Sequence, residues 1–198
     1  MLHKRTKWII GIDEAGRGPL AGPVVVAGIK INSKCKIQNA KLLKNIKDSK
    51  KLSAKQREEW FRILTTHPKI EWAVAKVSPK IIDRINIARS TNLGVARVYQ
   101  KLSPGEMCFA MLDGSLYLSK NTPHETIVKG DEKIPVIAAA SIIAKVTRDR
   151  IMCRLHKKYP QYRFDVHKGY GTKMHMEFIH KFGRSDIHRK SFAKGLIL

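Results

Sequence analysis

Acidic residues are scarce in this 198-residue chain, which contains 16 Asp and Glu residues against 39 Lys and Arg residues. The formal net charge of +23 indicates a polyanionic partner such as nucleic acid, because each phosphate that a cationic side chain neutralises releases counterions. A charge that only keeps the protein soluble is the alternative. In so basic a chain, the few acids that lie among apolar residues are the first candidates for a functional role.

Cysteines and long apolar runs are also few. The three cysteines, Cys35, Cys108 and Cys153, form no CxxC pair, so a disulfide framework is excluded and reduced thiols are expected. No segment approaches the roughly 18 apolar residues of a membrane span, and the apolar run near the N-terminus is too short for the core of a signal peptide. These absences predict a cytoplasmic protein with no membrane partner.

Apolar residues are plentiful enough for a hydrophobic core, at 43% of the chain. The length suits one compact domain. We therefore expect a single, monomeric domain over residues 1–198, with a core over about 1–159 and a small C-terminal helical cap over about 160–198.

The order of the predicted elements favours an α/β fold. Strands are predicted over 8–12, 24–31, 71–77, 107–112 and 126–128, and helices over 53–65, 78–102, 138–159 and 173–182. The first two strands are joined by a turn-rich segment and predict a hairpin. Ser53 and Gln56 have the spacing of a capping box. Strands followed by alternating strands and helices predict a sheet flanked by helices.

Two acidic segments directly follow predicted strands. Asp13 and Glu14 come after the first strand, and Asp113 comes after the strand over 107–112, with Gly114 allowing the chain to turn away. The carboxyl ends of strands are where α/β sheets present ligand sites. Ordinary turn-forming or helix-capping acids remain the alternative at both places.

Asp149 is a third candidate because of its place on a predicted helix. At about 100° per residue it falls on the same stripe as Ala138, Ile142, Val146 and Cys153. A carboxylate on a core-facing stripe costs several kcal/mol unless it is paired or binds a metal. A salt bridge to one of the many lysines is the alternative.

Four carboxylates brought together would repel one another unless cations neutralise them. Their oxygen-only ligand set suits Mg²⁺ or Mn²⁺ rather than zinc. Two such ions about 4 Å apart can activate a water and stabilise the leaving oxygen in phosphodiester cleavage. A basic surface around an acidic pocket therefore predicts a nuclease.

Several ordered blocks of this chain resemble the ribonuclease HII family. The blocks are Ile12–Val24, Asp48–Ser53, Asp113–Gly114, Ala138–Arg150, His167–Thr172 and His188–Phe192. They occur in the order of the family and span nearly the whole chain. The resemblance implies a ribonuclease H-like fold, with a mixed five-stranded sheet flanked by helices and a small C-terminal helical region.

The resemblance also implies site residues by position. The metal-binding catalytic carboxylates would be Asp13, Glu14, Asp113 and Asp149. The loop that approaches the ribonucleotide 2′-OH and the adjoining phosphate would be Gly16, Arg17 and Gly18. Tyr170 would stack on the deoxyribose after the ribonucleotide, and Ser49 and Lys50 would contact backbone phosphates. A tight turn, a core tyrosine and solvated lysines are the alternatives for these positions.

The implied activity is hydrolysis of the RNA strand of RNA–DNA hybrids, including single ribonucleotides embedded in duplex DNA, leaving 3′-OH and 5′-phosphate ends. Excision of misincorporated ribonucleotides is the expected role. The sister type 3 enzymes carry a further N-terminal domain and usually a Gly-Lys-Gly loop, whereas here the first strand begins near Trp8 and the loop is Gly-Arg-Gly. The segment 34–47 is more lysine-rich than the family pattern, and no clamp-binding peptide is evident before Leu198.

Two rival functions remain at this point. A non-catalytic nucleic-acid-binding protein, such as a ribosome-associated factor, would explain the charge but not an acid on an apolar stripe. A general ribonuclease or DNA-processing nuclease would differ in cutting substrates other than hybrids. None of the eight histidines has an assignable role.

Overall fold

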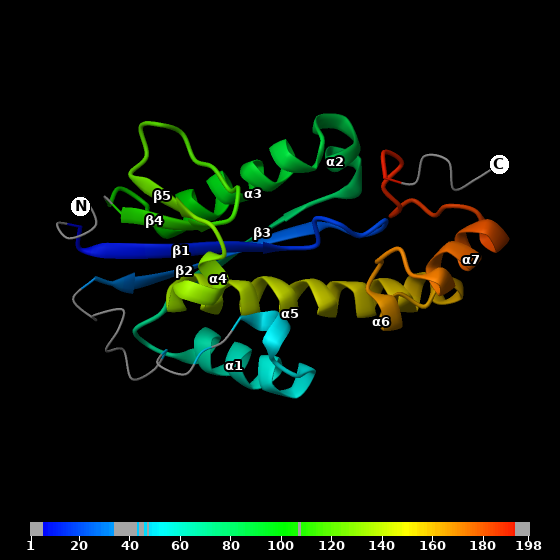
Figure 1. The fold of residues 1–198 in the computed structure, drawn as a ribbon, viewed down its shortest axis with the longest axis horizontal. Helices are drawn as coiled ribbons and strands as arrows, with labels where there is room; N and C mark the ends of the chain where they lie inside the picture. The colour runs from blue at the N-terminus through cyan, green and yellow to red at the C-terminus, as the bar shows by residue number, and fades with distance from the viewer. Residues whose placement is uncertain (1–5, 34–42, 44–45, 47, 107, 193–198) are drawn as a thin grey trace.

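A computed structural model of the chain describes residues 6–33, 43, 46, 48–106 and 108–192. Figure 1 shows a central sheet with helices on both faces and a helical region at one end, next to the C-terminus. Cys35, Met107 and most of the lysine-rich segment 34–47 lie outside the described residues. No helix in the described ranges is long and apolar enough to cross a membrane.

The sheet has five strands in the spatial order β3-β2-β1-β4-β5. Their bounds are β1 Trp8–Ala15, β2 Val24–Asn32, β3 Glu71–Val77, β4 Cys108–Asp113 and β5 His124–Ile127. Strands β1, β2 and β3 pair antiparallel, whereas β4 pairs parallel with both β1 and β5. The predicted opening hairpin and the mixed five-stranded sheet are therefore confirmed.

Helices cover both faces of this sheet. Their bounds are α1 Ala54–Thr66, α2 Pro79–Ile85, α3 Ile87–Leu102, α4 Gly130–Lys133, α5 Pro135–Lys158, α6 Phe164–His167 and α7 Lys173–Phe182, with 3₁₀ turns η2 Ser49–Lys51 and η3 Pro160–Tyr162. The helical segment predicted from Ser78 to about Leu102 is confirmed, and Asn86, which adopts φ 64°, divides it into two helices. The Asn86 side chain then accepts a hydrogen bond from the Arg89 N–H and caps α3.

Alternation along the strands decides which residues meet which helix. Ile9 on β1 and Phe109 on β4 belong to the core beneath α5 and α1. Ile10 and Leu112 belong to the core beneath α3. Because side chains alternate between the faces of a strand, Asp13 shares the α5 side with Ile9, and Asp113 shares it with Phe109.

Helix α5 lies unusually close to β1. A Cβ added at Gly11 would lie 2.5 Å from the backbone carbonyl of Val136, so only glycine allows this approach. The close contact places the start of α5, and α4 just before it, over the carboxyl end of β1.

The residues after α5 pack against the second half of that helix. Tyr162 and Phe164 are buried with Met152 of α5 and with Ala21 from the β1–β2 connection. Ala21 also forms an isolated antiparallel bridge with His188. The C-terminal region is therefore built onto the β1–β2 connection and the end of α5, which is where its residues meet the loop after β1.

Candidate active site

Three carboxylates meet at the carboxyl ends of β1 and β4. Asp13, Asp113 and Asp131 each offer an oxygen atom, and these oxygens all lie within 4.8 Å of one another. The parallel register pairs Ile12 with Leu112, so the next residues of the two strands, Asp13 and Asp113, lie side by side on the α5 side of the sheet. Asp131 comes from α4, which lies between the sheet and the start of α5 (Figure 1).

The cluster is electrostatically strained without a cation. Burial, followed by the charges of Glu14, Asp113 and Asp131, raises the pKa of Asp13 well above its usual value. Burial and the charge of Asp131 likewise raise the pKa of Asp113, although its Oδ1 accepts hydrogen bonds from the N–H groups of Gly130 at 2.7 Å and Asp131 at 3.2 Å. A positive charge bound between these carboxyl groups would therefore stabilise their ionised forms.

A hard divalent cation fits this group. All the available donors are carboxylate oxygens, which is the ligand chemistry of Mg²⁺ and Mn²⁺. Among the described residues, the ammonium in contact with these acids is Lys50 Nζ, which lies 3.1 Å from Asp131 Oδ2 and belongs to a side chain that is 79% exposed, so it can leave at little cost. One exposed lysine does not balance the cluster.

Glu14 lies beside the cluster, although it is not one of the three acids whose oxygens meet. It follows Asp13 on the strand, and both side chains line the same cavity and interact directly. Its Oε1 lies 3.5 Å from Arg17 Nη1, and its Oε2 is buried with no partner in the described part of the chain. Burial raises its pKa. A buried carboxylate oxygen without a donor is a further position at which a cation would fit.

A cavity of about 410 Å³ opens above these carboxylates. All the predicted site residues except Asp149 line it, namely Asp13, Glu14, Gly16, Arg17, Gly18, Ser49, Lys50, Asp113 and Tyr170. The structure thus brings together residues from β1, η2, β4 and the segment before α7.

Asp149 does not join this cavity, so the predicted placement is wrong. Its Oδ1 accepts a hydrogen bond from Lys145 Nζ at 2.9 Å, and it lines a different groove beside α1 and β3. Lys145 lines the cavity, but Asp149 lies one turn further along the helix, and its carboxylate is not among those whose oxygens meet within 4.8 Å. The lysine salt bridge, which was the alternative, is what the structure contains.

Asp131 was missed at the sequence level, although a signal for it was present. It follows a short strand, β5, just as Asp13 and Asp113 lie at the ends of β1 and β4. Gly130 is buried, and a Cβ there would lie 3.2 Å from Asp113 Oδ1 and 3.4 Å from Ile127 Cβ, so α4 begins close to the sheet. The rule that selected the other two acids would have selected Asp131 as well.

The loop that contains Gly16, Arg17 and Gly18 rests on two buried arginines. Arg189 donates hydrogen bonds to the carbonyl oxygens of Gly16 at 2.6 Å, Arg17 at 2.7 Å and Gly22 at 3.0 Å. Arg148 donates to the carbonyl oxygens of Ala21 and Pro23, both at 3.1 Å, and both arginines are 0% exposed. The guanidinium groups of Arg148 and Arg189 therefore fix the path of the loop from its protein-facing side.

These two arginines lack an acidic partner. Neither Arg148 nor Arg189 forms an ion pair within the described residues, and Arg148 Nη1 is buried without a hydrogen-bond partner there. Burial, and then the charge of Arg148, lowers the pKa of Arg189 to about 9. Two buried positive charges without a carboxylate lie under the loop, which favours an anion above it.

Gly16 is the position where this packing tolerates no side chain. It has φ 93°, and an added Cβ would lie 2.0 Å from Arg148 Nε, which the hydrogen bonds to the loop hold in place. We expect Gly16→Ala to lower the free energy of unfolding by about 2 kcal/mol or more. Gly18→Ala is the matched control, because nothing lies within 4 Å of a Cβ there. Urea unfolding of both variants measures this, and equal stabilities would contradict it.

Tyr170 is fixed by its backbone while its ring stays 41% exposed. Its carbonyl oxygen lies 2.9 Å from His175 Nδ1, and the ring lies over Arg148, with Cζ 5.6 Å from the ring centroid. The preceding Gly169, at φ 84°, accepts a hydrogen bond from the Leu20 N–H at 2.8 Å. The aromatic ring is therefore presented beside the Gly-Arg-Gly loop by direct contacts between the two segments.

A buried histidine pair supports Tyr170 from the protein side. The Nε2 atoms of His175 and His188 lie 3.1 Å apart and share a hydrogen bond, in which the N–H of one neutral ring donates to the other ring. Burial lowers the pKa of each to about 4, which keeps both rings neutral near pH 7. Their role is structural, and it was not visible from sequence because it depends on contacts between distant segments.

Ser49 and Lys50 reach the cavity from η2. The Asp48 side chain accepts a hydrogen bond from the Lys50 N–H at 3.0 Å, and the Ser49 N–H donates to Ser141 Oγ at 3.3 Å. These contacts tie η2 to α5 next to the carboxylates.

Comparison with known proteins agrees with this site. The family model described as ribonuclease HII matches residues 10–195. Ribonuclease HII of Coxiella burnetii is 46% identical over 188 residues, which cover 93% of this chain and 87% of that protein. Ribonuclease HII of Caldicellulosiruptor bescii is 41% identical over 197 residues, which cover 100% of this chain and 92% of that protein.

Solved structures show the same architecture. The ribonuclease H2 from Pyrococcus horikoshii has a TM-score of 0.77 and 27% sequence identity, and the match covers 96% of each chain. The structure of Bst-RNase HIII in complex with Mn²⁺ shares the fold, with a TM-score of 0.69 at 20% identity over 92% of this chain and 66% of that one. The chain therefore belongs to the ribonuclease HII family, and it is a divalent-metal-dependent ribonuclease H, an endonuclease that acts on RNA–DNA hybrids.

Proposed function

We propose that this chain cleaves on the 5′ side of a ribonucleotide in a duplex, including a single ribonucleotide embedded in DNA, and leaves 3′-OH and 5′-phosphate ends. The observation that carries the proposal is the meeting of Asp13, Asp113 and Asp131 oxygens within 4.8 Å, beside a loop that presents backbone groups to the same cavity. Excision of misincorporated ribonucleotides and removal of hybrid RNA are the corresponding roles.

The carboxylates hold the metal in this proposal. Asp13, Asp113 and Asp131 form the main ligand set, and Glu14 completes it with its unpartnered Oε2. Two divalent ions, Mg²⁺ or Mn²⁺, would supply an activated water and stabilise the leaving oxygen. The Mn²⁺ complex of Bst-RNase HIII supports this choice of ion. Asp149, which the resemblance had suggested, is left out because it lies in a different groove.

The Gly-Arg-Gly loop and Tyr170 select the bond. Gly18 has open space around its Cα, so a ribose can approach the loop backbone and present its 2′-OH, the group that distinguishes RNA from DNA. Arg17 Nη1, held 3.0 Å from Ser115 Oγ, is placed for the adjoining phosphate. The exposed Tyr170 ring stacks on the next sugar, and Ser49 and Lys50 contact the backbone.

The substrate partners in this proposal are RNA–DNA hybrids and ribonucleotide-containing duplex DNA. We propose a monomer as the active form, acting in the cytoplasm. A structure of an Archaeoglobus fulgidus relative contains a PCNA:RNase HII complex, with 28% identity and a TM-score of 0.72 over 91% of this chain.

A nicking assay tests the proposal. The substrate is an end-labelled DNA duplex with one ribonucleotide, and the controls are the all-DNA duplex and single-stranded RNA of the same sequence. With Mg²⁺ or Mn²⁺ we expect one nick on the 5′ side of the ribonucleotide and a 3′ end that a polymerase extends. Intact substrate with both metals would contradict the proposal, and equal cleavage of single-stranded RNA would indicate a general ribonuclease.

A further inference from the structure

A second depression, separate from the carboxylate cavity, lies between α1, β3 and the second half of α5. It measures about 790 Å³, and its floor includes Phe61, Trp72, Val74 and Val146. Trp72 is 41% exposed, yet its Nε1–H donates to the Thr65 carbonyl oxygen at 3.2 Å. Its ring also meets Phe61 edge-to-face, with centroids 6.4 Å apart. An aromatic surface is thus held in a fixed position and presented to solvent.

The rim of this groove carries an excess of positive charge. Lys76, Arg154 and Lys157 are exposed and form no ion pair within the described residues. The two acids of the rim are already neutralised: Glu58 pairs with Arg150, and Asp149 pairs with Lys145 at 2.9 Å.

A fixed aromatic floor beneath free cations fits single-stranded nucleic acid. Unpaired bases stack on aromatic rings while the phosphates meet the cationic rim, whereas the bases of a duplex are already stacked on one another and cannot reach the floor. An acidic peptide with apolar side chains would match the same charges. The position of the groove decides between these two occupants.

The groove adjoins the candidate active site through one ion pair. Lys145 lines the carboxylate cavity and pairs with Asp149, which lines the groove. Lys168 also lines the groove and lies two residues before Tyr170. A nucleic-acid strand that leaves the cavity past Lys145 would therefore reach the groove at Asp149, whose charge Lys145 already neutralises.

We propose that this groove binds a single-stranded segment of nucleic acid, adjoining the duplex that occupies the active site. The link to the duplex rests on the proposed function, but binding of a single strand to the groove does not. A substrate with an overhang next to the ribonucleotide would then bind more tightly than its blunt counterpart.

Binding is measured without metal, so that cleavage plays no part. The probe is a labelled 12-nucleotide oligo-dT in EDTA, and its Kd is followed by fluorescence anisotropy. We expect Trp72→Leu to weaken binding by about tenfold, since stacking on an aromatic ring is lost. For Arg154→Ala/Lys157→Ala, the slope of log K against log salt should fall by about 1.4, because each single-strand phosphate contact contributes about 0.7.

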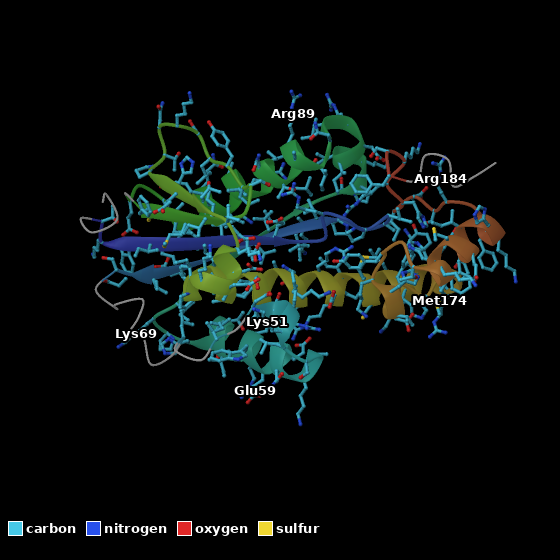
Figure 2. All side chains as sticks on the ribbon, in the orientation of Figure 1. Lys51, Glu59, Lys69, Arg89, Met174 and Arg184 are labelled. Atoms are coloured by element: carbon cyan, nitrogen blue, oxygen red, sulfur yellow. The ribbon has the colours of Figure 1, made fainter. Side chains whose placement is uncertain are left out.

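The matched control removes the same charge from the other face of the sheet. Arg84→Ala/Arg89→Ala changes residues on α2 and α3, and Figure 2 shows Arg89 on the side of the sheet away from α1 and α5. This variant should keep the salt slope of the wild type. Three results would each overturn the proposal. The two double variants could lose equal amounts of salt slope, or Trp72→Leu could leave the Kd unchanged. A poly-glutamate peptide of equal charge could also displace oligo-dT.

The two proposals fail separately. If the wild-type protein does not nick the single-ribonucleotide duplex but binds oligo-dT through Trp72, the proposed function is wrong and the groove stands. If it nicks the duplex but the Kd values of overhang and blunt substrates are equal in EDTA, the groove proposal is wrong and the function stands.

Discussion

Replacing Asp131 with asparagine is expected to reduce cleavage of the single-ribonucleotide duplex by on the order of 1,000-fold or more. A bound metal ion supplies several kcal/mol of transition-state stabilisation, and each 1.36 kcal/mol corresponds to tenfold in rate. Asparagine keeps the size of the side chain and loses the charge that faces Asp13 and Asp113. Single-turnover cleavage with Mg²⁺ or Mn²⁺ measures the effect.

The matched control is the neighbouring acid on the same helix. Glu132 is exposed, pairs with Lys51 at 3.0 Å and is not one of the acids whose oxygens meet within 4.8 Å, so Glu132→Gln should cleave at the wild-type rate. The charge of Asp131 contributes to the raised pKa of both Asp13 and Asp113. The Asp131→Asn protein should therefore melt at the same or a higher temperature than the wild type without metal, which would rule out misfolding as the cause.

Asp149→Asn gives the opposite test of the assignment. Asp149 contacts Lys145 and lines the neighbouring groove, so this substitution should reduce cleavage far less than Asp131→Asn does. If Asp149→Asn abolished cleavage while Asp131→Asn retained it, the ligand set drawn from the geometry would be wrong.

The contrast between Asp131 and Asp149 shows what sequence patterns determine in this site. Asp13 and Asp113 could be placed from sequence because each stands at the end of an apolar strand, and strand ends converge at one edge of a sheet. The stripe argument for Asp149 failed because α5 is buried on most of its circumference in its first half. When most of a helix is buried, the position of a residue on its apolar stripe does not determine whether that residue lies next to the carboxyl ends of the strands.

The fold shows the same division between local and distant causes. The helix after Ser53 was predictable because its capping box is a local contact with Gln56, and the structure contains both hydrogen bonds. The break at Asn86 was not, because a left-handed residue within a helical pattern shows no reliable local signal. The support of the loop after β1 by Arg189 joins residues more than 150 positions apart, and charge composition alone does not reveal it.

Replacing Arg189 with methionine is expected to have the second-largest effect. Three loop carbonyl oxygens, those of Gly16, Arg17 and Gly22, would lose their donor in a site where Arg189 is 0% exposed. Leaving a buried acceptor unsatisfied costs roughly 1–3 kcal/mol, so we expect the free energy of unfolding to fall by on the order of 3 kcal/mol. Arg184→Met, at an exposed position, is the control for the loss of one positive charge.

A loss of stability alone would not establish that Arg189 positions the loop. The loop approaches the ribose in the proposed function, so its displacement should also change which duplex is recognised, and a misplacement of about 1 Å can cost 100-fold in rate. For folded Arg189→Met we expect kcat to fall. We also expect the Kd for all-DNA duplex divided by the Kd for ribonucleotide-containing duplex, both measured in EDTA, to move toward one. Arg189→Lys keeps the charge but cannot reach three carbonyls, so it should shift this ratio in the same direction. An unchanged ratio in both variants would mean that the two buried arginines stabilise the fold without directing substrate choice.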